Sequence, residues 1–340
     1  MPTLVKCPNC GHEQSIEWDQ VRAHDEGVSM CTKCQVPIAQ LPSAGDRHTE
    51  MNAAPSGEGD ASLIDMVKEK LTSDEVELST IPVVAQQVLA SSQDPDCTLK
   101  DLESLVRKDQ VVAAKIVQVS NSSFYRGLKE VQALPDAIMR LGFKGVQNIT
   151  VAVAVKNNYQ CKNKQYLEVL QNLWTNSVHS AITCRELATA SRYPKEEEAF
   201  LAGLVHDIGR VFIINTLDRM SESDDRVKNL PDDIFEELLR VLHEGAGARL
   251  IESWMFPKMI CDAVRHHHNP AAVEEGKLVW ILAASDLVMQ KAGLGGYEAD
   301  DGLSLNNLAP MQALQLNDLE IAKLLVDLED KAEELLGNLG

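Results

Sequence analysis

The stretch from Ala199 to Ile213, AFLAGLVHDIGRVFI, constrains the fold of this chain more than any other stretch. Its large apolar side chains recur at helical spacing, which predicts a helix with one strongly apolar side. His206 and Asp207 lie side by side in the middle of that helix. Burying a carboxylate among apolar side chains is costly unless a partner such as a metal cation compensates it. The dipeptide therefore indicates either a metal site or a neutral histidine and a capped aspartate within a helix bundle.

The composition is that of a globular protein built from aliphatic-packed helices, with 44% hydrophobic and 4% aromatic residues. Its 340 residues are enough for about two domains and a sizeable core. The longest apolar runs are too short to span a bilayer, and the N-terminus lacks the apolar core of a secretory signal. We therefore expect a cytoplasmic protein with no membrane partner. The formal charge of -19, from 32 basic and 51 acidic residues, argues against a nucleic-acid partner.

Four of the eight cysteines form two C-x-x-C pairs, Cys7 with Cys10 and Cys31 with Cys34. Thiols stay reduced in the cytoplasm, so these cysteines are metal ligands or buried thiols rather than disulfides. Two such pairs at this spacing suit a four-thiolate tetrahedral zinc site. We predict a zinc ribbon of short β-hairpins over residues 1–40 that holds one Zn²⁺. A redox dithiol is the weaker alternative, because the βαβ context of redox C-x-x-C motifs is absent.

A linker and a long helical region follow the ribbon. Residues 41–61 are rich in Pro, Gly, Ser and Ala, which is the composition of a flexible linker. Residues 62–340 show one helical pattern after another and little strand-like alternation, so the fold class is all-α outside the ribbon. Capping-box patterns predict helix starts at Ser62, Thr98 and Asn317.

Histidines and carboxylates recur on several of the predicted helices. Helical bundles build metal sites from side chains that project inward from facing helices. Mixed imidazole and carboxylate sets suit divalent transition metals such as iron, manganese or zinc. Two ligand sets follow: one ion would be held by His179, His206, Asp207 and Asp286, and a second by Asp207, His243 and either His266 or His267.

Each of these residues also has a purely structural alternative. His179 would bond a backbone carbonyl in the core, and His243 would interact favourably with a helix C-terminus. The run of three histidines that begins at His266 would form a solvated corner, and Asp286 would pair with Lys277 or Arg210. The occurrence of all the candidates on different helices favours a shared metal site.

Several short motifs occur in a fixed order between about residues 74 and 280. They are Leu78–Pro82, Asp94–Asp96, Asn121–Tyr125, Leu134–Ile138, Leu141–Gly142, Leu204–Gly209 and Trp254–Pro257. Together they resemble the HDOD domain, the output-domain branch of the HD superfamily of metal-dependent phosphohydrolases. The resemblance implies an all-helical fold in which an N-terminal lobe, about 62–170, packs on an HD-like lobe, about 171–340. It also implies a bacterial regulatory module of signal transduction, a class in which most members have no known catalysis.

Two features of the sequence bear on catalysis within this resemblance. The chain keeps residues that match the HD metal ligands, which implies one or two divalent metals in an HD pocket. It lacks the Gly-Tyr-Pro motif of the cyclic-dinucleotide phosphodiesterases after its histidine run, and Arg210 stands where those enzymes carry a lysine. Arginine can hold a phosphate but does not replace lysine like for like.

Two functions from different classes follow. The first is an interaction or output module that binds a protein partner of a signalling pathway. The alternative is a metal-dependent phosphohydrolase acting on a nucleotide or related phosphoester, with Arg210 as the catalytic residue that steadies developing charge on a small phosphorylated ligand.

Overall fold

The structure is a computed structural model in which the chain forms two compact units, Met1–Ala61 and Ser62–Gly340. It describes residues 3–6, 13–16, 28–30, 37–40, 58–72, 80–91, 94–122, 124, 125, 127, 129–273 and 276–339.

The described part of the first unit contains two antiparallel strand pairs and the first residues of α2 (Glu58–Thr72). Strand β1 (Thr3–Lys6) pairs with β2 (Glu13–Ile16), and β3 (Val28–Met30) pairs with β4 (Pro37–Gln40). The four cysteines of the expected ribbon lie outside the described residues, as does most of the expected linker. The zinc ribbon and the linker therefore stay predictions.

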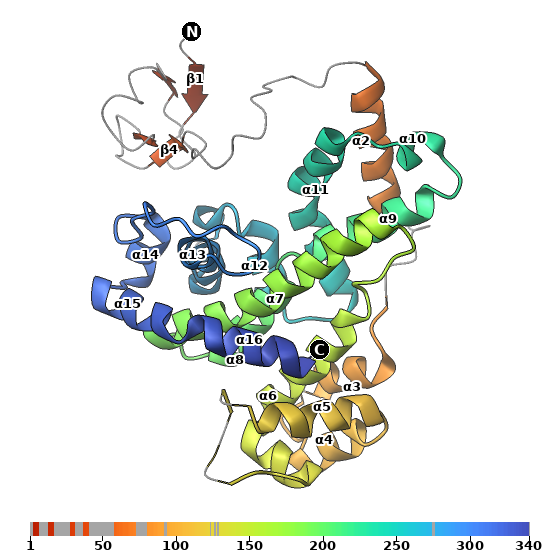
Figure 1. Cartoon of the computed structure of the whole chain (residues 1–340), viewed down its shortest axis with the longest axis vertical. Helices are drawn as coiled ribbons and strands as arrows, with labels where there is room; N and C mark the ends of the chain where they lie inside the picture. Colours follow the sequence, from red (N-terminus) through yellow and green to blue (C-terminus); the bar gives the residue numbers. More distant parts are fainter. Residues whose placement is uncertain are drawn as a thin grey trace. The chain divides into compact units, whose positions relative to one another are not determined.

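All the regular secondary structure in the described residues of the second unit is helical (Figure 1). Its first helices are α2 (Glu58–Thr72), α3 (Val83–Ser91), α4 (Leu99–Val106), α5 (Gln110–Ser120), α6 (Leu134–Lys156), α7 (Lys164–Ala190), α8 (Glu196–Val205) and α9 (Ile208–Met220). They are followed by α10 (Asp225–Lys228), α11 (Asp232–Ser253), α12 (Lys258–His266), the short 3₁₀ helix η1 (Pro270–Ala272), α13 (Lys277–Ala292), α14 (Ala309–Leu314), α15 (Asp318–Val326) and α16 (Leu328–Leu339). The all-α prediction for this region is confirmed.

Local sequence signals set several of the helix ends. Thr98 and Asp101 form a reciprocal capping box at the start of α4, and Asn317 and Glu320 form another at the start of α15. The cap predicted at Ser62 is wrong, because α2 already begins at Glu58. A capping pattern has no effect when the chain before it is itself helical.

Helices α3, α4, α5 and α6 pack against one another at one end of the unit (Figure 1). The long helix α7 packs against α8, α13 and α16, and α9 packs against α11. The C-terminal helix α16 contacts both groups, since it also packs on α5. The Lys115 and Lys156 ammonium groups donate to the carbonyls of Asn338 and Leu339. The end of the chain is thereby fixed against α5 and α6.

The stretch predicted as one helix through His206 and Asp207 is two helices. Helix α8 ends at Val205, the two residues form a turn, and α9 begins at Ile208. The expected single apolar side was also wrong, because all but one of the residues from Ala199 to Asp207 are buried. The break turns the Asp207 carboxylate toward histidines of other helices, a contact that no local pattern encodes.

One described stretch, Glu196–Met220, has the length and hydropathy of a helix able to cross a membrane. It is the α8–α9 pair, and 89% of its most apolar window is buried inside the helical unit. Burial of this kind is also what the central helices of a globular core show.

Gly209 and Gly203 bring helices into backbone contact. A Cβ at Gly209 would collide with the carbonyl of His243 on α11, and one at Gly203 would lie 2.6 Å from the carbonyl of Ser180 on α7. Only hydrogen at these two positions allows α8 and α9 to sit this close to their neighbours.

We expect Gly209→Ala to lower the free energy of unfolding by about 3 kcal/mol, because the α9–α11 contact has no room for a methyl group. Urea denaturation followed by circular dichroism measures the change. Gly337→Ala on α16 is the matched control, since a Cβ there meets open space. The control should stabilise the protein by about 0.5–1 kcal/mol through helix propensity. Equal stabilities of the two variants would contradict this packing.

Candidate metal centre

Six side chains from four places in the fold meet in the second unit. His206 and Asp207 come from the break between α8 and α9, and His243 comes from the middle of α11. His267 and His268 follow directly on the last residue of α12, and Asp286 lies on α13. We call this set the His–Asp cluster: His206, Asp207, His243, His267, His268 and Asp286.

Three of the imidazoles are fixed by their own helices. Nδ1 of His206 lies 2.8 Å from the carbonyl of Gly203, Nδ1 of His243 lies 2.8 Å from that of Leu239, and Nδ1 of His267 lies 2.7 Å from that of Val264. A carbonyl only accepts, so each Nδ1 carries the proton and donates it. In the neutral ring Nε2 then keeps its lone pair, and Nε2 is the atom that points into the cluster.

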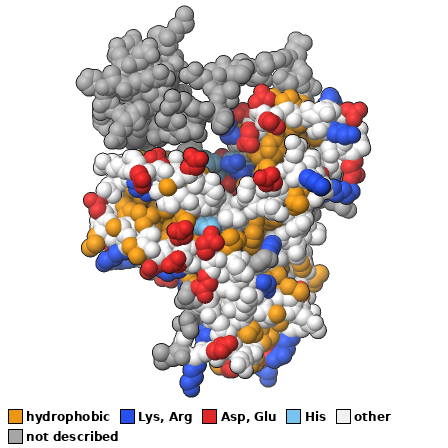
Figure 2. Space-filling view, in the orientation of Figure 1, with side chains coloured by type: hydrophobic (Ala, Val, Ile, Leu, Met, Phe, Trp, Pro, Cys, Tyr) orange, Lys and Arg blue, Asp and Glu red, His pale blue; other side chains and the backbone are white. Residues whose placement is uncertain are grey.

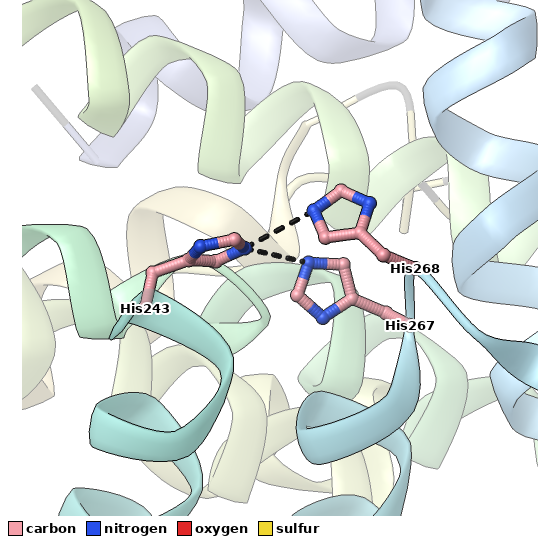
Figure 3. A group of neighbouring side chains, drawn as sticks. All are labelled: His243, His267 and His268. Atoms are coloured by element: carbon pink, nitrogen blue, oxygen red, sulfur yellow. Dashed lines mark hydrogen bonds between the residues drawn. The ribbon is translucent and has the colours of Figure 1, made fainter. Parts of the chain in front are cut away.

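The Nε2 atoms face one another at short range (Figure 3). Nε2 of His243 lies 3.3 Å from Nε2 of His267 and 3.1 Å from Nε2 of His268. His243 and His267 both have Nδ1 as their protonated nitrogen, so neither Nε2 can donate to the other. Two lone pairs held this close repel unless a cation or a donor lies between them.

Asp207 connects the two halves of the cluster. Its Oδ2 lies 3.5 Å from Nε2 of His206, and its Oδ1 lies 3.7 Å and 3.9 Å from Nε2 of His243 and His267. The same Oδ1 accepts a hydrogen bond from Nε of Arg210 at 3.0 Å. Arg210, which the sequence analysis gives as a residue that could steady charge on a phosphate, forms an ion pair with Asp207.

The pKa values of the two carboxyl groups of the cluster are shifted in opposite directions. Burial alone would raise the pKa of Asp207, but the neighbouring His206 and Arg210 outweigh it and hold the pKa well below its usual range. Burial raises the pKa of Asp286 to about 6, partly opposed by His206, whose Nε2 is 3.8 Å away. Asp207 is thus the permanent anion of the cluster.

The pKa values of two histidines point to neutral rings. Burial lowers the pKa of His243, and it lowers that of His267 well below the usual range. Neutral imidazole is the form that binds transition metals.

Two of the expected ligands lie elsewhere. His179 is buried on α7, where Nδ1 lies 2.8 Å from the carbonyl of Thr175 and Nε2 lies 3.5 Å from Oε1 of Glu333 on α16. His266 is half-buried at the end of α12, and within the described residues no hydrogen bond or ion pair joins its side chain to the cluster. The structure thus places His267, but not His266, with His243.

Sequence reasoning did not select His268 or Glu244 as site residues. The backbone N–H of His268 donates to Oε1 of Glu244 at 3.3 Å, and that carboxylate also lies 3.9 Å from Nδ1 of His267. Glu244 thus holds the turn that presents both imidazoles. Its position directly after His243 is the only signal in the sequence, and adjacency of this kind is a weak one.

The donor set fits a divalent transition metal. Two ligand atoms that are each about 2.0–2.2 Å from one ion lie roughly 2.8–3.6 Å apart at right-angled or tetrahedral coordination. Nε2 of His243 lies 3.1 Å from Nε2 of His268 and 3.3 Å from Nε2 of His267, and both distances fall in that range. The distance of 3.5 Å between Nε2 of His206 and Oδ2 of Asp207 does so too. The contacts from Asp207 to His243 and His267 and from Asp286 to His206 are a few tenths of an ångström longer.

The sequence profile of the HDOD domain matches residues 78–270 of the chain. A protein of Treponema pallidum with no assigned function is 23% identical over 221 residues, which are 63% of this chain and 42% of that protein. The chain thus spans less than half the length of this relative.

Two solved structures share the fold. The putative metal-dependent phosphohydrolase from Shewanella amazonensis has a TM-score of 0.64 and 19% identity, and the match covers 84% of this chain and all of that one. The putative signal transduction protein from Marinobacter aquaeolei has a TM-score of 0.59 and 23% identity, covering 83% of this chain and 65% of that one. At these identities the likeness shows the fold alone.

Proposed function

Because the chain belongs to the HDOD family, we propose that it is a regulatory protein of signal transduction whose helical unit holds a divalent metal ion in the His–Asp cluster. One structural neighbour is named a putative signal transduction protein, and another a putative metal-dependent phosphohydrolase. These names agree with a regulatory domain that has kept the metal-binding character of its superfamily.

The observation that carries the metal proposal is the orientation of the imidazoles. His243 and His267 both donate through Nδ1 to carbonyls of their own helices, so their Nε2 lone pairs face each other at 3.3 Å. Burying two lone pairs in this way is unfavourable without a cation. Asp207 supplies the negative charge that a cation would balance.

The first ion would be bound by Nε2 of His243, His267 and His268, with Oδ1 of Asp207 near two of these rings as the balancing negative charge. A second ion would have His206, the other oxygen of Asp207 and Asp286 as ligands, which gives this second position fewer ligands than sequence reasoning expected. Iron, manganese or zinc would suit either position. In a regulatory domain, a bound ion would fix the ends of α8 and α12 and the middle of α11 relative to α13.

We also propose that the ribbon Cys7, Cys10, Cys31 and Cys34 holds a structural Zn²⁺ and serves as a docking module for a protein partner. Residues 1–40, a linker from residue 41 to the start of α2, and the two lobes within 62–340 would then be the functional divisions of the chain. The charge of -19 supports a protein partner rather than a nucleic acid, and a cytoplasmic location accords with zinc-bound thiolates.

The metal content of the full-length protein tests the proposal. After loading with Mn²⁺, Fe²⁺ or Zn²⁺ and dialysis, the wild type should carry the ribbon zinc and at least one further ion per chain. His243→Ala should lose the ion that the three histidines bind, because Nε2 of His243 lies close to Nε2 of both His267 and His268. Elemental analysis by mass spectrometry gives the count.

His266→Ala is the matched control, since this neighbouring histidine lies outside the cluster, and it should keep the full count. A variant with all four ribbon cysteines changed to serine should lose only the ribbon zinc. If that variant carried no metal under any loading condition, the metal centre in the helical unit would be ruled out.

The second candidate is a metal-dependent phosphohydrolase acting on a nucleotide or related phosphoester. It is favoured by the exposure of His268, which opens one side of the cluster to solvent, and by the position of Arg210 beside Asp207. A bound divalent ion would supply Lewis-acid chemistry. Hydrolysis of bis(nitrophenyl) phosphate by the loaded wild type, lost in His243→Ala but kept in His266→Ala, would establish this function in place of a purely regulatory one.

A further inference from the structure

Glu244 lies on α11 directly after His243 but contributes no atom to the His–Asp cluster. The His243 side chain is 1% exposed and lies within the cluster, whereas the Glu244 side chain is 30% exposed. Acidic side chains are spread over the face of the molecule shown in Figure 2, where histidine side chains reach the surface at few points. Charge alone therefore does not distinguish Glu244 from other carboxylates, and its role follows from its contacts.

The Glu244 side chain contacts the turn after α12. Helix α12 ends at His266, and in a continued helix the N–H of His268 would donate to the carbonyl of Val264, four residues earlier. That carbonyl instead accepts from Nδ1 of His267, at 2.7 Å. The N–H of His268 donates to Oε1 of Glu244 on α11, at 3.3 Å. Glu244 thus supplies an acceptor in place of the carbonyl that orients the His267 ring.

This exchange of acceptors bears on which nitrogen of His267 faces the cluster. Because Nδ1 donates to the carbonyl of Val264, the neutral ring keeps its lone pair on Nε2, which lies 3.3 Å from Nε2 of His243. The next ring, His268, comes from the same turn, and its Nε2 lies 3.1 Å from Nε2 of His243 (Figure 3). Two of the three clustered imidazoles therefore depend on a turn whose N–H is accepted by Glu244.

The Glu244 carboxylate also lies behind the His267 ring as seen from the cluster. Its Oε1 is 3.9 Å from Nδ1 of His267, which is too long for a hydrogen bond but close enough for an electrostatic interaction. A carboxylate behind a metal-binding imidazole raises the basicity of the nitrogen that faces the metal. Glu244 thus acts on the His267 ring through both the turn and its charge.

We propose that Glu244 is a positioning residue for the first ion position, the one formed by His243, His267 and His268; this inference rests on the metal site proposed above. Glu244 holds the turn after α12 so that His267 keeps its proton on Nδ1 and directs Nε2 to the ion. The second ion position takes its ligands from other segments, so Glu244 has no part in it.

Co²⁺ binding tests the proposal. The test uses the full-length chain with all four ribbon cysteines changed to serine, which we call the parent chain, because its ribbon thiolates cannot take up the probe. Isothermal titration calorimetry counts the bound ions and gives their Kd values. Glu244→Ala should raise the Kd of one ion about 10–100-fold, the usual effect of removing a group that orients a metal-binding histidine. The Kd of a second ion should not change.

Glu244→Gln separates the hydrogen bond from the charge. The amide oxygen can still accept from the N–H of His268, but the negative charge near the His267 ring is lost. The Kd of this variant should therefore lie between those of the parent chain and Glu244→Ala.

Glu252→Ala is the matched control. Glu252 lies on the same helix and also reaches α12, where its Oε1 lies 2.6 Å from Nη2 of Arg265. Within the described residues no hydrogen bond or ion pair joins Glu252 to the His–Asp cluster. This variant should bind Co²⁺ as the parent chain does. A loss equal to that of Glu244→Ala would overturn the proposal, because any loosening between α11 and α12 would then have the same effect.

A second measurement needs no metal. NMR chemical shifts of the imidazole nitrogens in the metal-free chain identify the protonated nitrogen of His267. It should be Nδ1 in the parent chain and a mixture of Nδ1 and Nε2 in Glu244→Ala, because the N–H of His268 can then compete for the carbonyl of Val264. His243, whose Nδ1 donates within its own helix, should keep its tautomer in both.

Equal Kd values for Glu244→Ala and the parent chain would overturn the inference, as would an unchanged tautomer of His267. Equal Kd values for Glu244→Gln and Glu244→Ala would overturn the role of the hydrogen bond. If the parent chain bound no Co²⁺, the proposed metal site itself would fail, and the tautomer of His267 would still decide whether Glu244 positions the ring.

Discussion

Asp207→Ala should remove the metal of the helical unit and lower the free energy of unfolding by about 3–5 kcal/mol, the cost of breaking a buried ion pair. The Asp207 side chain is 13% exposed and its Oδ1 accepts from Arg210 at 3.0 Å. Without the carboxylate, the Arg210 guanidinium would lose its counterion in a half-buried position. Urea denaturation and elemental analysis of the same preparations measure both effects.

A double variant separates the two effects. Asp207→Ala combined with Arg210→Met removes the uncompensated charge, so it should recover most of the stability but none of the metal. Asp262→Ala, which breaks an exposed pair with Lys258, is the control and should cost no more than about 1 kcal/mol. A stable Asp207→Ala protein with full metal content would refute the central role given to this carboxylate.

Glu197→Ala should lower the free energy of unfolding by about 2–3 kcal/mol, because Glu197 joins α8 to the group of helices from α3 to α6. Oε1 lies 3.0 Å from Nη2 of Arg185, and Oε2 accepts from Nδ2 of Asn148 at 2.7 Å. The Arg185 guanidinium also lies over the ring of Phe124, 4.1 Å from its centroid. Both charged side chains are about one-fifth exposed, so the effect should fall between those of surface and fully buried pairs.

Denaturant unfolding gives the magnitude, and Glu222→Ala is the matched control. Glu222 forms a short but exposed ion pair with Lys162 at 2.6 Å, so its loss should cost no more than about 1 kcal/mol. Equal effects of the two substitutions would show that the Glu197 contacts do not join the two groups of helices.

The Glu197 carboxyl also predicts a pH dependence. Burial raises its pKa above the ordinary value of 4.5, although Arg185 opposes the shift. The folded state then binds more protons than the unfolded state, so this group adds stability as the pH falls through its folded pKa. Relative to Glu197→Gln, the wild type should therefore gain stability between neutral pH and about 4.5.

Local patterns were enough for several parts of this structure. The capping boxes at Thr98 and Asn317 formed as predicted, because a cap depends only on residues within one helical turn. The cap at Ser62 failed because the helix extends beyond it, which a short motif cannot report. The residue types of the cluster were also evident, since buried His and Asp side chains among apolar residues require partners.

The identity of the convergent side chains depended on contacts between distant segments. His266 and His267 are equivalent by spacing, but α12 ends at His266, and the following turn directs His267 and His268 toward His243. His179 lies on a face of α7 that meets α16, more than a hundred residues later in the chain. Sequence spacing alone therefore left His266 and His267 open as alternatives, and it could not show that the His179 side chain meets α16 instead of the cluster.

Helical periodicity and capping motifs predict that residues beyond the linker form helices and where two of those helices begin, and the position of Asp207 among apolar residues indicates that its carboxylate needs a partner. Contacts between distant segments set the break of the chain at His206 and Asp207 and the approach of Asp207 to His243 and His267. These two kinds of feature depend on contacts at different separations along the chain. Helix periodicity and caps are set by neighbours within about four residues, whereas the direction of a buried imidazole is set by which helix packs against it.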